Sequence, residues 1–268
     1  MRLHARVLGD GPALVLLHGF TGDAAAWGEH PQAFAGRHRV IVVDLPGHGA
    51  SPPPPPACGL WEIADAVVDA AVRLGGAHGD WLGYSLGGRV ALHVALRHPQ
   101  HVRRLVLESA SPGIDAADAR AARAAADDDL ARVIERDGIA AFVERWLAQP
   151  LFATQARLPP AVRAAERARR LAASPPALAA ALRVMSVGRQ DPLLPRLPEL
   201  RSPTLLIAGA DDPAYRAHAG RMAERLPDAR AVVVQDAGHA THLENPAAFR
   251  EAVGAFLADA PLRVPGAA

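Results

Sequence analysis

A serine lies between two glycines in the segment 83–87, which reads Gly-Tyr-Ser-Leu-Gly and matches the pattern Gly-x-Ser-x-Gly. The segment follows a short apolar run at 80–83 and precedes a helical pattern at 86–97. A serine on so sharp a strand-to-helix turn has a strained backbone and needs small neighbours, and the helix N-terminus adds partial positive charge beneath its hydroxyl. We therefore predict that Ser85 is a nucleophile. The alternative is a glycine-rich turn that happens to contain a serine.

A serine hydroxyl is a weak nucleophile or base unless an imidazole activates it. The chain has 12 histidines, so position and order along the chain must select one. His239 lies in a loop after the last apolar run, 231–234. A loop at the carboxyl end of that strand would lie on the same side of the sheet as Ser85. We therefore predict that His239 activates Ser85.

The acid that orients this imidazole is expected at the end of an earlier strand. The apolar run 204–208 leads into two neighbouring candidates, Asp211 and Asp212. The chain order serine, aspartate, histidine is one that catalytic triads follow. The aspartate that does not contact the imidazole would cap the following turn. Glu108, at the end of another apolar run, is a third candidate.

Two backbone N–H groups are candidates for binding negative charge. Residues 18–22 read His-Gly-Phe-Thr-Gly and follow the first buried run. The N–H of Phe20, together with that of Leu86, is predicted to form an oxyanion hole. The alternative interpretation of residues 18–22 is a simple tight turn.

The elements that must position these residues follow from the hydrophobic pattern. Short, near-continuous apolar runs are typical of strands buried on both faces, as in a parallel sheet. Such runs occur at 13–17, 40–43, 80–83, 105–108, 204–208 and 231–234. Helical patterns lie between them, at 60–74, 86–97, 214–225 and 246–258. This alternation predicts right-handed βαβ units and an α/β fold with a mainly parallel sheet flanked by helices.

The alternation stops between residues 112 and 196. This stretch contains no strand-like run. It contains helical patterns at 116–137, 139–149, 160–172 and 176–184. It therefore predicts an inserted helical cap over the carboxyl edge of the sheet, where ligands bind in such folds. The predicted core domain comprises 1–111 and 197–268. The cap has 13 arginines against 10 acidic residues, so its net charge is positive.

Composition excludes several classes of protein. The 29 basic residues face 28 acidic ones, a balance unlike that of a nucleic-acid binder. All 29 are arginine, so the chain has neither a Schiff-base lysine nor the lysine of a P-loop. The single cysteine, Cys58, excludes an internal disulfide, and the His-x-x-His pairs lack a third metal ligand. Since no apolar run approaches the ~18 residues that span a bilayer, we expect a cytoplasmic protein that does not bind a membrane. We also expect no metal and no cofactor, and the sequence does not determine the oligomeric state.

These motifs, in this order, resemble the α/β-hydrolase superfamily over essentially the whole chain. A finer resemblance is to the 2-succinyl-6-hydroxy-2,4-cyclohexadiene-1-carboxylate synthase family of menaquinone biosynthesis. It rests on residues 17–22, 83–89 and 107–113, and Phe-Val-x-x-Trp at 142–146 with Pro-Leu-Phe at 150–152 extends it into the predicted cap. Arg89 and the Ser-Ala-Ser-Pro-Gly string at 109–113 are its most diagnostic features.

The resemblance implies an elimination rather than a hydrolysis. In that family the triad acts as a base, which removes a ring proton and expels pyruvate from 2-succinyl-5-enolpyruvyl-6-hydroxy-3-cyclohexene-1-carboxylate. No metal or organic cofactor takes part. The family's usual Gly-x-x-Asp spacing favours Asp212 over Asp211 as the acid of the triad.

The polycarboxylate substrate explains a need for arginines, because guanidinium groups bind carboxylates bidentately and stay charged. By resemblance, the substrate-binding residues are Arg89, Tyr84, Arg123, Trp146 and Arg170. Because the register of the alanine-rich cap is not fixed by the sequence, Arg120 is an alternative to Arg123, and Arg169 is an alternative to Arg170.

Two other functions remain as alternatives. One is a serine hydrolase that acts on a small carboxylic ester, thioester or C–C bond. The other is a ligand-binding or scaffold protein without turnover, against which an intact triad argues. Three arginines around one pocket argue against a simple esterase, since it has no need for them. The leading prediction is therefore a cofactor-independent lyase.

Overall fold

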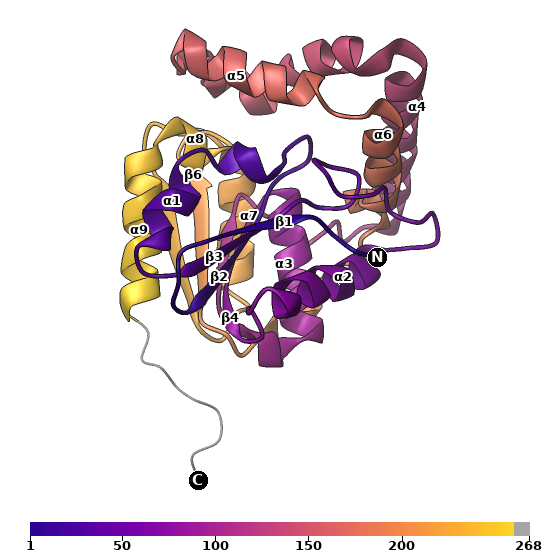
Figure 1. Ribbon diagram of the computed structural model, residues 1–268. Helices are drawn as coiled ribbons and strands as arrows, with labels where there is room; N and C mark the ends of the chain where they lie inside the picture. The colour runs from indigo at the N-terminus through magenta and orange to yellow at the C-terminus, as the bar shows by residue number, and fades with distance from the viewer. Residues whose placement is uncertain (260–268) are drawn as a thin grey trace.

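The computed structural model describes residues 1–259 and contains a seven-stranded sheet with helices on both faces (Figure 1). The strands lie in the order β1-β3-β2-β4-β5-β6-β7. β1 pairs antiparallel with β3, and the other pairs are parallel. The prediction of an α/β fold with a mainly parallel sheet is confirmed. The strands are β1 (Ala5–Leu8), β2 (Ala13–Leu17), β3 (Arg39–Val43), β4 (Gly79–Tyr84), β5 (Val102–Glu108), β6 (Thr204–Gly209) and β7 (Ala229–Val234).

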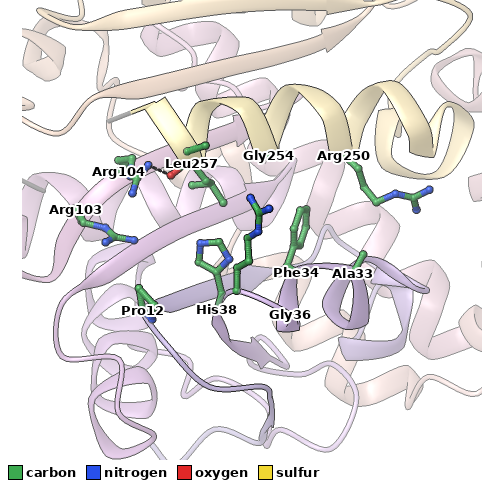
Figure 2. A pocket seen from close by; sticks show the side chains of 12 residues that line it. Pro12, Ala33, Phe34, Gly36, His38, Arg103, Arg104, Arg250, Gly254 and Leu257 are labelled. Carbon is green, nitrogen blue, oxygen red and sulfur yellow. Dashed lines mark hydrogen bonds between the residues drawn. The ribbon is translucent and has the colours of Figure 1, made fainter. Parts of the chain in front are cut away.

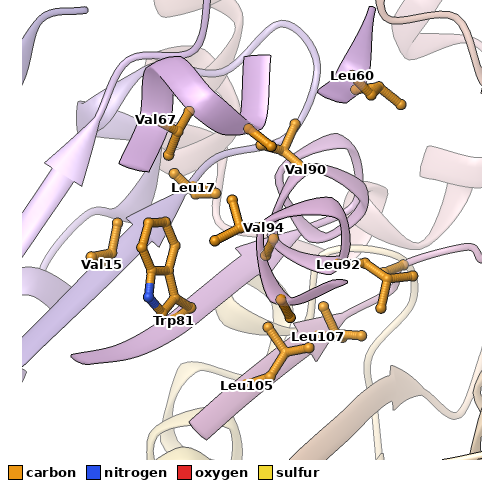
Figure 3. Close-up of a cluster of buried hydrophobic side chains, with 14 of the residues drawn as sticks. Val15, Leu17, Leu60, Val67, Trp81, Val90, Leu92, Val94, Leu105 and Leu107 are labelled. Atoms are coloured by element: carbon orange, nitrogen blue, oxygen red, sulfur yellow. The ribbon is translucent and has the colours of Figure 1, made fainter. Parts of the chain in front are cut away.

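The apolar runs of β2 to β6 are buried because helices cover both faces of the sheet. The run at 231–234 was expected to be buried on both faces as well, but β7 lies at the edge of the sheet and is largely exposed. Val15 and Leu17 belong to one hydrophobic core with Trp81 and the side chains of α2 and α3 (Figure 3). Residues of α7 belong to the same core. Leu14 and Leu16 belong to a second core with α1 and α9, since successive side chains of a strand point to opposite faces. The helices outside the 112–196 segment are α1 (His30–Ala35), α2 (Leu60–Arg73), α3 (Leu86–Arg97), α7 (Pro213–Ala223), α8 (Thr241–Glu244) and α9 (Pro246–Asp259).

Three short elements are absent from the sequence-based prediction. β1 has four residues, lies at the edge of the sheet and is only partly buried, so its sequence contains no continuous apolar run. α1 and α8 have six and four residues, too few to establish a helical period. Residues 260–268, which end the predicted core domain, lie outside the described residues.

Between β5 and β6 the chain forms α4 (Ala117–Leu147), α5 (Pro160–Leu171) and α6 (Pro175–Val184). Two helices were expected where α4 lies; they join at Gly138, whose φ of 80° and ψ of 175° break the helical path. α4 and α6 share a small core that includes Ile134 and Leu178, and Figure 1 shows α5 extending over the edge at which β6 ends. Within residues 1–259 no single helix is long and apolar enough to cross a bilayer; α5 and Pro175–Arg189 meet that test only as a pair bent by 88°.

Five short 3-10 segments complete the described elements. η3 lies between α4 and α5, and η4 and η5 follow α6, so most of the 112–196 segment is helical. The segments are η1 (Ala24–Trp27), η2 (Pro99–His101), η3 (Pro150–Arg157), η4 (Val187–Arg189) and η5 (Leu194–Glu199).

Candidate active site

Ser85 links β4 to α3, and its backbone has φ 52° and ψ −108°, which residues other than glycine rarely adopt. Close packing around the turn explains the flanking glycines. A Cβ on Gly83 would lie 2.3 Å from the carbonyl oxygen of Gly87, and a Cβ on Gly87 would lie 2.0 Å from that of Leu17. The Ser85 N–H also donates to the Glu108 carbonyl oxygen at 2.8 Å. The turn therefore holds Ser85 firmly at the carboxyl end of β4.

The side chains of Ser85, His239 and Asp212 form a chain of hydrogen bonds. His239 Nε2 lies 3.0 Å from Ser85 Oγ, and His239 Nδ1 lies 2.9 Å from Asp212 Oδ2. His239 and Asp212 are 2% and 5% exposed. Because an ionised carboxylate only accepts hydrogen bonds, the proton is assigned to Nδ1, which leaves Nε2 to accept the serine proton. This is the geometry by which an imidazole activates a serine hydroxyl.

The structure distinguishes the two neighbouring aspartates. Asp211 is exposed, and its Oδ2 accepts a hydrogen bond from Arg157 Nη2 at 2.6 Å. Asp212 contacts His239 through Oδ2, while its Oδ1 accepts the N–H of Tyr215 at 3.2 Å and so caps α7. The expectation that the other aspartate caps this turn is wrong, because the two oxygens of one carboxylate perform both roles.

Glu108, the third candidate acid, is buried at the end of β5 and contacts a different histidine. Its Oε1 accepts hydrogen bonds from Thr241 Oγ1 at 2.7 Å and from the His242 N–H at 2.9 Å, and His242 Nδ1 also lies 2.9 Å away. Burial alone would raise the pKa of Glu108, but His242 and these donors hold it below its ordinary value. Glu108 therefore holds the start of α8, the short helix that follows His239.

Two buried histidines, which the sequence analysis did not select, hold the loop that carries Phe20. His18 Nδ1 donates to the Gly19 carbonyl at 2.8 Å, and His48 Nε2 accepts the Thr21 N–H at 3.3 Å. Burial lowers the pKa of His18 to about 4 and that of His48 to about 3, so both rings are neutral at pH 7. Each adjoins a glycine in a turn, the one signal by which the sequence marks them.

The two residues predicted to supply oxyanion donors lie beside the serine. Phe20 and Leu86 line the same cavity as Ser85. Leu86 is the first residue of α3, so its N–H has no acceptor within the helix. The Phe20 loop approaches the serine turn so closely that a Cβ on Gly19 would lie 2.7 Å from the Tyr84 ring.

Two chambers meet at Ser85 and Phe20. The smaller, which we call the Arg170 chamber, has a volume of about 30 Å³, and the larger, the Arg89 chamber, has about 240 Å³. The Arg170 chamber is lined by Tyr84, Phe152, Glu166, Arg169, Arg170 and His239, among others. The Arg89 chamber is lined by Leu86, Arg89, Arg123, Trp146, Met185 and Tyr215, among others.

Arg170, the predicted substrate-binding residue, and Arg169, its alternative, both line the Arg170 chamber. Arg169 Nη1 donates to the Thr21 carbonyl at 3.0 Å, and Arg170 Nε donates to Thr21 Oγ1 at 3.2 Å. Burial lowers the pKa of Arg170 below its ordinary value. The C-terminal end of α5 thus contacts the loop that carries Phe20, and the two arginines act as neighbours rather than as alternatives.

In the Arg89 chamber, Arg89 is held by two acceptors from the segment after α6. Its Nη2 donates to the Met185 carbonyl at 2.8 Å and its Nη1 to Gln190 Oε1 at 3.1 Å. Burial lowers the pKa of Arg89 to about 10, so it stays a cation at neutral pH. Arg123 lines the same chamber and donates to Asp127, whereas Arg120 does not line it and donates to the carbonyls of Ile114 and Asp115.

Aromatic rings also line the two chambers. The Trp146 ring lies 5.2 Å from that of Phe20, and its buried Nε1 has no hydrogen-bond partner among the described residues. The Tyr84 ring lies 5.4 Å from that of His239. Tyr215, which the sequence analysis missed, lies 4.4 Å from the His239 ring on the Arg89 side. Its position two residues after the N1 proline of α7 is no functional signal in the sequence.

The histidine pairs do not form a metal centre in the part of the chain that the structure describes. There, no group of three or more His, Cys, Asp or Glu side chains is arranged to hold a metal ion. His239 and His242 contact different carboxylates, Asp212 and Glu108. In the other pair, His98 Nε2 lies 2.6 Å from Asp65 Oδ1.

A larger cavity of about 760 Å³ lies at the amino edge of the sheet, away from Ser85 (Figure 2). Two of its arginines have structural partners: Arg103 and Arg104 both contact the fully buried Asp80, and Arg104 also donates to the Leu257 carbonyl. Its described lining includes no serine, cysteine or carboxylate side chain. The chemistry-bearing residues therefore gather at the carboxyl edge.

The chain is similar to known proteins both in sequence and in structure. Residues 12–246 match a family described as alpha/beta hydrolase fold. The chain is 36% identical over 264 residues to the putative 2-succinyl-6-hydroxy-2,4-cyclohexadiene-1-carboxylate synthase of Bacillus subtilis (strain 168), covering 94% of this chain and 93% of that protein. It is 34% identical to the 2-succinyl-6-hydroxy-2,4-cyclohexadiene-1-carboxylate synthase of Salmonella paratyphi C (strain RKS4594), covering 96% and 99%. The structure of MenH from S. aureus superposes with a TM-score of 0.91 at 33% identity, covering 95% and 97%.

Proposed function

Because the chain belongs to the α/β hydrolase fold family and is similar to these synthases over nearly its whole length, we propose that it is a carbon–oxygen lyase of menaquinone biosynthesis. Its substrate would be 2-succinyl-5-enolpyruvyl-6-hydroxy-3-cyclohexene-1-carboxylate, from which it eliminates pyruvate. The observation that carries the proposal is the hydrogen-bonded Ser85, His239 and Asp212 between two arginine-lined chambers. An ordinary esterase needs the first feature but not the second.

The conversion of a 3-cyclohexene into a 2,4-cyclohexadiene defines the bond changes. The proton on C2, beside the succinyl carbonyl, passes to the base, and its electron pair forms the C2–C3 double bond. The C3–C4 pair moves to C4–C5, and the C5–O bond to the enolpyruvyl group breaks. The released enolpyruvate takes up a proton and becomes pyruvate.

In this proposal Ser85 and His239 act together as the base. Proton transfer through Ser85 Oγ leaves an imidazolium on His239, which the Asp212 carboxylate stabilises at 2.9 Å. Negative charge develops on the succinyl carbonyl oxygen as C2 loses its proton. The N–H groups of Phe20 and Leu86 would stabilise that oxyanion.

The arginines would hold the carboxylates of the substrate on either side of the serine. Arg89 and Arg123 are available in the Arg89 chamber, and Arg169 and Arg170 in the Arg170 chamber. Tyr84 and Trp146 would contact the ring or its substituents. Guanidinium groups provide bidentate hydrogen bonds that fix orientation as well as charge.

We also propose the division of the chain into a core, 1–111 with 197–268, and a cap, 112–196. The support is that Phe20 and Ser85 come from loops at strand ends, whereas Trp146 and Arg170 come from the helices between β5 and β6. A cap that carries half of the site would exclude water from the reaction. The charged substrate is consistent with a cytoplasmic reaction.

The test is release of pyruvate from the enolpyruvyl substrate by the purified protein, followed with a coupled dehydrogenase and by the absorbance of the diene. A neutral p-nitrophenyl ester is the comparison substrate. We expect pyruvate release by the wild type, none by Ser85→Ala, and poor ester hydrolysis by both. Brisk ester hydrolysis without pyruvate release would reject the lyase and favour the serine hydrolase.

A further inference from the structure

A carboxylate of the protein already lies within the Arg170 chamber. Glu166 is on α5, three and four residues before Arg169 and Arg170, and lines the chamber with Ser85 and His239. Its Oε2 accepts a hydrogen bond from Arg170 Nη1 at 2.9 Å and another from Arg169 Nη2. Neither the predicted base nor the predicted oxyanion donors contact it.

The two arginines keep donors that the protein does not use. Arg169 Nε is buried and has no hydrogen-bond partner within residues 1–259, and Thr21 and Glu166 accept the bonds that the two guanidinium groups do make. A buried donor without a partner is costly, so such groups are usually completed by a ligand or by water. The chamber is therefore arranged for more acceptor oxygens than the protein supplies.

Little free space remains in this chamber, about 30 Å³, and Glu166 lines it together with both arginines. A substrate carboxylate that accepts hydrogen bonds from the same guanidinium groups would therefore meet the carboxylate of Glu166. Glu166 and its two partners lie on one helix at i, i+3 and i, i+4, so rotation of a single side chain vacates the position without unfolding α5.

We propose that Glu166 determines the specificity of this chamber by occupying the position of a substrate carboxylate, which must displace it. The inference rests on the proposed function, because it assumes that the site binds a polycarboxylate. A ligand carboxylate can replace the hydrogen bonds that the two arginines lose when Glu166 moves away. A neutral substituent cannot replace them, so entry of an uncharged group leaves both guanidinium groups without an anion.

Direct binding of succinate, a small dicarboxylate, tests the proposal without turnover. We would titrate it calorimetrically into the wild type, Glu166→Gln and Glu144→Gln. Glu144 on α4 is the matched control. Its exposed carboxylate accepts a hydrogen bond from Arg167 of α5 at 2.8 Å, and it lines neither chamber. Each variant removes one negative charge, but only Glu166→Gln removes it from beside the two chamber arginines.

We expect Glu166→Gln to bind succinate about tenfold more tightly than the wild type. The ligand carboxylate would no longer compete with an anion of the protein, and the free-energy gain is about that of one hydrogen bond to a charged group. Glu144→Gln should bind it as the wild type does, and Arg170→Ala added to Glu166→Gln should abolish the gain. Glu166→Asp, whose carboxylate is one methylene shorter, should give a smaller gain and serves if the glutamine variant does not fold.

Unchanged or weaker binding by Glu166→Gln would overturn the proposal and make Glu166 a support for the arginines. An equal gain in Glu166→Gln and Glu144→Gln would also overturn it, since the effect would then be one of net charge. Failure of the wild type to release pyruvate would reject the proposed reaction while leaving the succinate result to decide the role of Glu166.

Discussion

Replacing Arg89 by alanine should reduce both turnover and stability, for separate reasons. The guanidinium lies in the chamber beside Ser85, where it would bind a substrate carboxylate. Hydrogen bonds to charged groups contribute about 1.5–3 kcal/mol, so kcat/KM for the polycarboxylate should fall by about one to two orders of magnitude. Lysine should restore little of this, since a point charge cannot reproduce the planar pair of donors.

The loss of stability follows from where the other donors of Arg89 point. They bond the Met185 carbonyl and Gln190, so the side chain on α3 fastens the segment after α6 to the sheet. Burying the cation is itself costly, as its pKa of about 10 indicates, and this offsets part of the gain. We expect a net loss of about 1–2 kcal/mol, or about 2–8 °C in the midpoint of thermal unfolding.

The assay compares pyruvate release and thermal unfolding, followed by circular dichroism, for the wild type, Arg89→Ala and Arg89→Lys. Arg120→Ala is the control, because Arg120 donates only to backbone carbonyls and lies outside both chambers. Retention of kcat/KM within about threefold in Arg89→Ala, at unchanged ester hydrolysis, would refute a carboxylate-binding role for Arg89. Full recovery in Arg89→Lys would refute the argument from bidentate geometry.

Three further predictions concern the triad, metals and pH. Ser85→Ala and His239→Ala should each abolish most pyruvate release, and the double variant should be little worse than either, whereas additive losses would contradict a shared proton transfer. Asp212→Asn should lose more activity than Asp211→Asn, and the reverse order would transfer the role to Asp211. A chelator should leave turnover unchanged; loss that a divalent ion restores would contradict the mechanism. Denaturant unfolding should become easier between pH 7 and pH 5, by up to about 2 kcal/mol for each histidine whose folded pKa lies near 4. Burial lowers the pKa values of His18, His30, His48 and His93 to about 4, 4, 3 and 4, so the folded protein keeps these rings neutral. The free energy of unfolding is therefore highest above pH 6.5 and falls as the pH decreases. A free energy of unfolding that does not change between pH 7 and pH 5 would contradict this prediction.

The sheet could be predicted because its signal is local. Strands β2 to β7 each contain one of the predicted apolar runs, and α3 begins and ends at the predicted residues. A strand buried on both faces needs a continuous apolar run whatever the rest of the chain does. β1 escaped prediction because it has only four residues, one of which is an arginine, so it contains no continuous apolar run. β7 also lies at an edge, but its run of valines was recognised.

The positions of Ser85 and His239 are likewise local consequences of turn chemistry. Only glycine fits beside the serine turn, because backbone carbonyls lie within 2.3 Å of each missing Cβ. The choice between Asp211 and Asp212 is not local, since both follow the same strand. It depends on the α7 cap and on Arg157, which comes from a segment 54 residues earlier.

The amino-acid sequence by itself determined the apolar strand runs, the serine turn and the loops that carry the candidate aspartates and His239, because each depends on residues that are near neighbours in the chain. Tertiary structure alone decided the contents of the two chambers. Arg169 and Arg170 meet Thr21 across 148 and 149 positions, and Tyr215 meets His239 from helix α7. Such contacts depend on how separate helices pack over a strand end, and no periodicity or motif records that packing.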